Sequence, residues 1–261
     1  MRIIVSIKQV PDTTEVRVDP ETNTLIREGV ESIINPFDMY AIEEAVRLKE
    51  KHGAETIVIT MGPPQAESAL REALALGIDK AIHITDRAFA GSDTWATSYI
   101  LAQAIKKIGE YDLIICGKQA SDGDTAQVGP GMAAHLDLPQ IAYVKKIEEI
   151  SQEKKMIVAE RLVEDGFETL KAPLPCLITV VKEINEPRLP SLRGKMRAKK
   201  AEIVKWNKDA IGVEEDKIGL RGSPTQVVKI FTPPQKKGGE IWQGEPEELG
   251  ARLAKELKKY L

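Results

Sequence analysis

Two carboxylates, two side-chain amides and two hydroxyl groups lie close together in the stretch GKQASDGDTAQVGP, residues 117–130. Asp122 and Asp124 suit the hydroxyl groups of a ribose or the amino group of an adenine, but they would repel a phosphate held at their oxygens. Backbone amides at the start of a following helix suit phosphates instead. The loop therefore indicates a site for a whole nucleotide, although a polar loop leading into a capped helix would use the same residue types.

The helix that follows this loop has two candidate starts. Asp124 with Gln127 three residues later resembles a capping box, which predicts that the helix begins near Thr125. Alternatively, Pro130 is the first helical residue and Gly129 precedes it. The residues alone leave both starts open.

Glycines in this loop allow the backbone to turn tightly or to approach other groups. We expect Gly117 and Gly123 to do so. Two familiar phosphate fingerprints are missing from the chain: there is no G-x-x-x-x-G-K-[ST] loop, and the G-x-G-x-x-A match that begins at Gly129 does not directly follow its strand. The loop is therefore not a common phosphate cradle.

The elements that must position the loop alternate between short apolar runs and longer amphipathic segments. Buried strands are predicted at 2–8, 55–62, 80–85 and 111–117, and helices at 35–53, 65–77 and 92–109. Asp38 is expected to cap the first helix, and Ser92 or Asp93 the third. This rhythm predicts an α/β fold with a doubly wound, mostly parallel Rossmann-like sheet that is covered on both faces. A hairpin-like excursion is predicted over residues 15–29.

After residue 140 the rhythm changes, because four strand-like segments follow one another without helices. They are residues 141–150, 154–163, 167–175 and 176–181, and they predict an antiparallel addition to the sheet. We expect residues 1–200 to form the nucleotide-binding domain, with an irregular basic loop at 185–200. Residues 201–261 are predicted to form an extended C-terminal arm that ends in a helix and lies on another chain.

Composition bounds the class of protein. The chain has 261 residues, 42% of them hydrophobic, and a formal net charge of −3, so nothing global points to nucleic acid. Cys116 and Cys176 lie in apolar runs and are expected to be buried thiols of a reducing compartment. No apolar run approaches the roughly 20 residues of a membrane span. The dispersed histidines predict neither a metal site nor a catalytic triad, and we expect a cytoplasmic protein.

Three stretches together resemble the beta subunit of electron-transfer flavoproteins. They are NPFDMYAIEEAVRLKEKHG (35–53), GKQASDGDTAQVGP (117–130) and INEPRLPSLRGKMRAKKAEI (184–203), and the likeness extends over nearly the whole chain. The resemblance implies a heterodimer with an alpha subunit that carries FAD. It also implies that this chain holds a nucleotide: a structural AMP in one branch, or a second FAD that takes a hydride from NADH in the electron-bifurcating branch.

The bifurcating branch is implied by DGDTAQVGP, in which Val128 stands where AMP-binding members usually carry a threonine. A hydroxyl that caps an AMP phosphate would crowd a continuing diphosphate, and valine leaves that space. One electron would then pass to ferredoxin or flavodoxin, and the other through the alpha-subunit FAD to an acyl-CoA dehydrogenase-type partner. NADH oxidation is expected only from the heterodimer or a larger complex. The alternative is a non-bifurcating beta subunit with AMP.

The resemblance also implies which residues contact the nucleotide, and all of them follow predicted strands of one parallel sheet. No catalytic side chain is among them, because a flavin performs the redox step itself. The implied set is Ser6, Lys8, Asn35, Pro36, Phe37, Asp38, Met61, Gly117, Gln119, Ala120, Asp122, Gly123, Asp124, Thr125, Gln127 and Val128. Of these, Met61 is more typical of packing, and Lys8 is as typical of a solvated strand end.

The basic stretch at 185–200 resembles the family's recognition loop for the partner dehydrogenase. Two prolines are expected to deny it helix. The implied partner-binding residues are Leu189, Leu192, Arg193 and Lys195, with Leu192 as the apolar anchor inside a ring of charge. A solvated charge run is the plain alternative. Nucleic-acid binding is disfavoured because interleaved aromatic residues are missing.

Two other classes of function have the same kind of sheet or ligand. An ATP pyrophosphatase on a similar sheet would need a Ser/Gly-rich loop after the first strand, and SIKQVPDTTE has none. A binding module with AMP as a fixed ligand is the runner-up. The nucleotide and flavin content of the heterodimer distinguishes it from a bifurcating subunit.

Overall fold

The computed structural model describes residues 1–12, 17–18, 25–26, 32–228 and 238–260. Its centre is a nine-stranded sheet in the order β11-β10-β9-β12-β8-β1-β6-β7-β13. The parallel core contains β1 (Arg2–Ser6), β6 (Glu55–Met61), β7 (Lys80–Ile84) and β8 (Leu113–Gly117), as the sequence predicts. Every neighbouring pair from β9 to β13 in that order is parallel.

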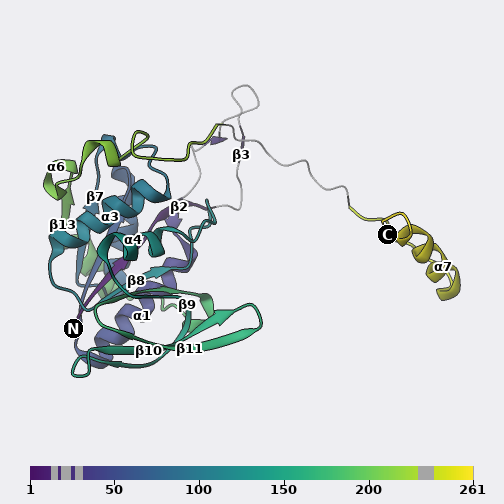
Figure 1. Cartoon of the computed structure of the whole chain (residues 1–261), viewed down its shortest axis with the longest axis horizontal. Coiled ribbons are helices and arrows are strands. Elements are labelled where there is room, and N and C mark those ends of the chain that lie inside the picture. The colour runs from purple at the N-terminus through teal and green to yellow at the C-terminus, as the bar shows by residue number, and fades with distance from the viewer. Residues whose placement is uncertain (13–16, 19–24, 27–31, 229–237, 261) are drawn as a thin grey trace.

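Helices cover both faces of the sheet, because successive strand residues point to opposite sides. Ile3 and Val5 of β1 pack under α1 (Pro36–His52), α2 (Glu67–Leu76) and α5 (Leu192–Lys200). Ile4 faces α3 (Thr94–Ile108), α4 (Val128–Leu136) and the short α6 (Lys208–Ile211). The doubly wound α/β class is confirmed, and Figure 1 shows the helices on either side of the strands.

The antiparallel addition is narrower than the sequence predicts. β9 (Gln140–Ser151), β10 (Met156–Val163) and β11 (Gly166–Pro173) pair antiparallel and form one end of the sheet. The expectation for residues 176–181 is wrong, because β12 (Cys176–Val180) is parallel to both β8 and β9. Its five residues are all buried, which is typical of a central parallel strand and gives no alternation to read.

Short strands flank the entry to α1. β2 (Gln9–Pro11) pairs antiparallel with β5 (Ser32–Ile34), which leads directly into the helix. β3 (Arg17–Val18) and β4 (Leu25–Ile26) form the predicted hairpin pair, and the turn that connects them lies outside the described residues. Gly53, with φ 65°, ends α1 as predicted. Asp93 rather than Ser92 caps α3, because it accepts from the amides of Trp95 and Ala96.

The region after residue 185 differs from the expected irregular loop and arm. Residues 192–200 are helical despite the nearby prolines, because both prolines precede Ser191, whose side chain caps α5 at Gly194. β13 (Ile203–Trp206) joins the sheet beside β7, and the side chains of Ile211 and Ile218 are buried. The extended part of the arm thus starts well after residue 201.

Farther along the arm, α7 (Pro246–Leu257) has no buried residue and stands away from the sheet in Figure 1. Among the residues that the structure describes, no helix has the length and apolar character needed to cross a membrane.

Candidate functional site

The carboxyl ends of β1 and β8 lie side by side at the centre of the sheet, where Ser6 is in register with Cys116. The chain leaves them in opposite directions: β1 connects through α1 to β6 on one side, and β8 connects through α4 to β9 on the other. Such a switch point is where open parallel sheets bind their ligands. The sequence-predicted loop at 117–127 begins there.

Asp38 joins the two strand ends. The backbone N–H of Lys8 donates to its Oδ2 at 2.7 Å, and the N–H of Gly117 donates to its Oδ1 at 3.1 Å. Its side chain is 5% exposed. Burial raises the pKa of Asp38 to about 7, against the lowering effect of these bonds and of Asn35. Asp38 is therefore a buried side chain that links the two loops, and we call its contacts with Lys8 and Gly117 the Asp38 bracket.

The expectation that Asp38 caps α1 is wrong. The helix begins at Pro36 with Asn35 as its N-cap residue, so Asp38 is the third helical residue. Proline is favoured at the first helical position because its missing N–H would have no intrahelical partner. The acidic side chain still lies in the first turn, where the helix dipole favours negative charge.

Asn35 fixes the loop that leaves β8. Its Nδ2 donates to the carbonyl of Gln119 at 2.8 Å, and its Oδ1 accepts from the N–H of Ser121 at 3.0 Å. The side chain is buried, and its own N–H donates to the carbonyl of Lys8 at 2.9 Å. One asparagine thus ties the β1 end to the β8 loop through backbone groups alone.

Polar side chains fill the tip of the loop. Lys8 Nζ contacts both carboxylate oxygens of Asp122, at 2.6 and 2.7 Å, so this lysine does more than end a strand in solvent. Gln119 Nε2 donates to Asp124 Oδ1 at 2.8 Å. Asp124 and Ala126 have φ of 49° and 53°, a left-handed conformation that costs free energy for residues with a Cβ. The loop is held in a defined and locally strained shape.

The two glycines have different roles. A Cβ on Gly117 would lie 2.4 Å from Asp38 Oδ1 and 2.6 Å from the carbonyl carbon of Phe37. Close approach to the first turn of α1 therefore requires glycine at this position. A Cβ on Gly123 would meet no atom within 4 Å, so close packing does not require glycine at this position.

Helix α4 starts at neither of the predicted positions. It begins at Val128 after Gln127, and Pro130 is its third residue. The first four amides of a helix have no intrahelical acceptor, so the proline ring removes no helical bond there. Gln127 is not part of a capping box: its Oε1 accepts from Thr94 Oγ1 at 2.8 Å, and its carbonyl accepts from the N–H of Gly131.

The remaining implied contacts lie at the same edge of the sheet with different exposure. Phe37 is half-buried and Pro36 exposed, both in the first turn of α1, while Ala120 is half-buried and Thr125 exposed in the loop. Met61 ends β6 and packs against the apolar cluster under α3 and α4. The hydrogen bonds described above therefore join Lys8, Asn35 and Asp38 to the loop, whereas Met61 is a packing residue.

Two residues of this site were not found from the sequence. The hydroxyl of Thr94 on α3 donates to Gln127, and the N–H of Ser121 donates to Asn35 Oδ1. Both contacts join segments far apart in the chain, and their residue types are common in loops, so no local pattern identifies them.

The predicted partner-binding residues form a second surface, which we call the docking segment and define as residues 189–195. Leu189 is 90% and Leu192 77% exposed, and Arg193 and Lys195 are exposed beside them. A groove of about 540 Å³ runs between this segment and the end of α2 and is lined in part by Leu76 and Arg197. Exposed leucines with surrounding cations are typical of a protein contact.

Comparison with known proteins identifies the family of the chain. Residues 22–211 match the electron transfer flavoprotein domain family. The chain is 52% identical over 258 residues to electron transfer flavoprotein subunit beta of Thermoanaerobacterium thermosaccharolyticum, which covers 98% of each chain. It is 50% identical over 261 residues to the caffeyl-CoA reductase-Etf complex subunit CarD of Acetobacterium woodii, which covers 99% of this chain and 98% of that one.

A third relative, protein FixA of Sinorhizobium fredii, is 49% identical over 262 residues, covering 98% of this chain and 92% of FixA. These matches extend over both the loop at 117–127 and the docking segment. The chain therefore belongs to the electron transfer flavoprotein family, as a beta subunit.

Proposed function

We propose that the loop at 117–128 holds the adenylate end of an FAD, and that this chain works with an alpha subunit in NADH-dependent electron bifurcation. The observation that carries the proposal is the bracketed loop at the β1–β8 switch point, in which carboxylates precede a helix that starts with Val128.

The donor set fits a nucleotide. Asp122 and Asp124 are exposed acceptors for ribose hydroxyls. The first-turn amides of α4 and the ammonium group of Lys8 are donors for phosphate oxygens. Lys8 already lies against Asp122, so the cation and the carboxylate reach the same place. Asn35 and Asp38 hold the backbone beneath them and need not touch the ligand.

Val128 favours FAD over AMP. As the first residue of α4 it stands where the chain turns from the loop into the helix, and it is half-buried. Its methyl groups cannot donate a hydrogen bond to a terminal phosphate, so the loop lacks a contact that would favour AMP over a longer diphosphate. When bound, FAD supplies the redox chemistry, accepting two electrons from NADH and passing them on singly. The chain's residues bind and orient it.

Partners follow from the exposed surfaces. The docking segment suits an acyl-CoA dehydrogenase-type flavoenzyme. The relative CarD is named as a subunit of a caffeyl-CoA reductase-Etf complex. Ferredoxin or flavodoxin is the proposed low-potential acceptor. The apolar side chains of Ile241, Leu253 and Leu257 are more than half exposed and suit the alpha subunit. The proposed location is the cytoplasm.

Acid extraction of the purified heterodimer tests the cofactor. We expect two FAD and no AMP per heterodimer, and bleaching of the flavin absorption by NADH. One FAD with one AMP, and no bleaching of a second flavin, would assign the chain to the non-bifurcating alternative. Val128→Thr provides a matched comparison, because threonine keeps the β-branched shape and adds a hydroxyl. We expect this variant to retain less FAD and more AMP.

A further inference from the structure

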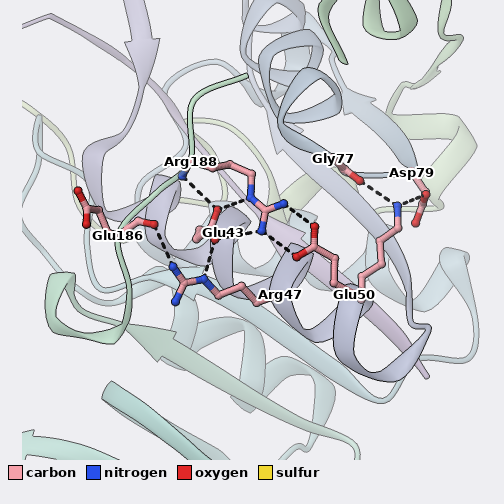
Figure 2. Close-up of polar contacts among 8 residues, drawn as sticks. Glu43, Arg47, Glu50, Gly77, Asp79, Glu186 and Arg188 are labelled. Carbon is pink, nitrogen blue, oxygen red and sulfur yellow. Dashed lines mark hydrogen bonds and ion pairs between the residues drawn. The ribbon is translucent and has the colours of Figure 1, made fainter. Parts of the chain in front are cut away.

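Residues 185–188 lie along α1, and Arg188 binds it through ion pairs (Figure 2). The guanidinium of Arg188 donates from Nε to Glu43 Oε2 at 2.8 Å and from Nη2 to Glu43 Oε1 at 3.2 Å. It also contacts both carboxylate oxygens of Glu50, at 2.5 and 3.0 Å. Glu43 and Glu50 are seven residues apart, so they face the same side of the helix and present two carboxylates to one planar fork.

Glu43 is the unusual member of this cluster. Its side chain is 4% exposed, whereas that of Glu50 is 58% exposed. Burial raises the pKa of Glu43, but hydrogen bonds from Arg188 and Arg47 outweigh it and bring the pKa below its ordinary value. A buried carboxylate is strongly destabilising once its partner is removed. If Arg188 left α1, only Arg47 would compensate the buried carboxylate of Glu43, so the burial of Glu43 favours Arg188 staying in place.

Further contacts anchor both ends of the docking segment. Before it, Arg47 Nη2 donates to the carbonyl of Glu186 at 3.1 Å, and Asn185 Nδ2 donates to the carbonyl of Tyr40 at 3.1 Å. After it, Arg197 Nη2 donates to the carbonyl of Leu74 at 2.8 Å. The exposed leucines are thus displayed between an anchor on α1 and an anchor on α2.

The anchor on α1 is continuous with the nucleotide site, because the first turn of the same helix holds the β1 and β8 loops through Asn35 and Asp38. We propose that Arg188 and Glu43 are a positioning pair, which fixes the docking segment on α1 at a set place relative to the nucleotide loop and so determines how productively the partner flavoenzyme docks. This inference rests on the proposed partner docking.

Arg188→Lys and Glu43→Gln in the purified heterodimer test the pair. Lysine keeps the charge but not the planar fork. With a purified short-chain acyl-CoA dehydrogenase as electron acceptor, we expect the KM for the dehydrogenase to rise about five- to tenfold, as more side chains must be ordered on docking. The kcat should change less than about twofold, and nucleotide content should stay as in the wild type. Amide hydrogen exchange should accelerate at Arg188, whose N–H donates to Glu43 Oε2, and not in the loop at 117–127.

Lys49→Met is the matched control. Lys49 lies on the same helix and pairs with Asp79 and the carbonyl of Gly77 rather than with residues 185–188 (Figure 2). It should leave the KM for the dehydrogenase unchanged. An unchanged KM and unchanged exchange in both test variants would overturn the pair's role, as would loss of nucleotide from them. A wild-type heterodimer that fails to reduce the dehydrogenase would count against the proposed function instead, and the exchange measurement would still decide whether the pair fixes the segment.

Discussion

The Gly117→Ala substitution tests how the nucleotide loop is held. The added methyl group would lie 2.4 Å from Asp38 Oδ1, 2.6 Å from the carbonyl carbon of Phe37 and 2.7 Å from Phe37 Cβ. These atoms belong to the first turn of α1, which packs on the sheet and cannot yield as a flexible side-chain end would. The end of β8 must therefore move away from α1, and the 3.1 Å hydrogen bond to Asp38 is lost.

The expected cost has two parts. Overpacking of a well-packed interior costs about 1–3 kcal/mol. Loss of a hydrogen bond to a buried charged group costs about 1.5–3 kcal/mol. Together they lower the free energy of unfolding by roughly 2.5–6 kcal/mol. With a urea m value of about 3 kcal/mol/M, the unfolding midpoint falls by roughly 0.8–2 M.

Urea unfolding of the purified heterodimer, followed by circular dichroism, measures this effect, and ultrafiltration with absorption spectra measures nucleotide retention. Gly123→Ala is the matched control in the same loop, because its methyl group would meet no atom within 4 Å. It should change the free energy of unfolding by less than about 0.5 kcal/mol. Equal midpoints and equal nucleotide content for both variants would refute the bracket formed by Asp38 and Gly117.

Two further predictions concern Asp38 and the exposed leucines. Since the pKa of Asp38 is raised to about 7, ionisation opposes folding: its contribution to stability is greatest below pH 4, falls as the pH rises to 7, and is constant above. Relative to Asp38→Asn, the wild type should lose up to about 1.4 kcal/mol per pH unit in that window in urea titrations, and parallel pH curves would contradict this. Leu192→Arg, and separately Leu189→Arg, should lower electron transfer to the dehydrogenase with nucleotide content retained; unchanged rates in both would exclude the docking segment as the contact.

The parallel core could be predicted from sequence because its strands are short apolar runs between helices with one apolar face. Ile57 and Val58 point to opposite faces of the sheet, and both are buried because helices cover both faces. A strand in such a sheet is therefore a continuous apolar run. The same continuous apolar run is why the predicted direction of β12 is wrong. A fully buried strand without a preceding helix has no local mark of its direction, so its parallel pairing with β8 depends on contacts more than 60 residues apart.

The start of α5 was missed for a different reason. Pro187 and Pro190 signal a break, but a proline acts only on its own residue and the one before it. Ser191 directly after them is a strong N-cap, and the following residues tolerate helix. The basic residues that suggested a loop instead serve the helix, because Arg197, Lys199 and Lys200 lie in its last turn, where positive charge is favoured.

The residues at the tip of the loop could be named from the sequence more easily than the residues that hold the loop. Residue type alone makes Asp122 and Asp124 candidates, and their contact with a ligand stays a prediction. The contacts that hold the loop could not be predicted, because Asn35 and Asp38 bind backbone groups of residues 8 and 117–121. Any residue other than proline supplies the same N–H and C=O, so the residue types there give no sign of these contacts.

The residues that hold the loop and the residues proposed to contact the ligand are different sets. The frame of the loop depends on two buried side chains that bind backbone atoms, whereas the proposed ligand contacts at positions 122, 124 and 128 are exposed or half-buried. Under the proposed function, a change in the second set alters which ligand the loop accepts more than how it folds. We therefore expect exchange of a methyl group for a hydroxyl group at position 128 to shift the preference between FAD and AMP, while Asn35, Asp38 and Gly117 are needed for either ligand.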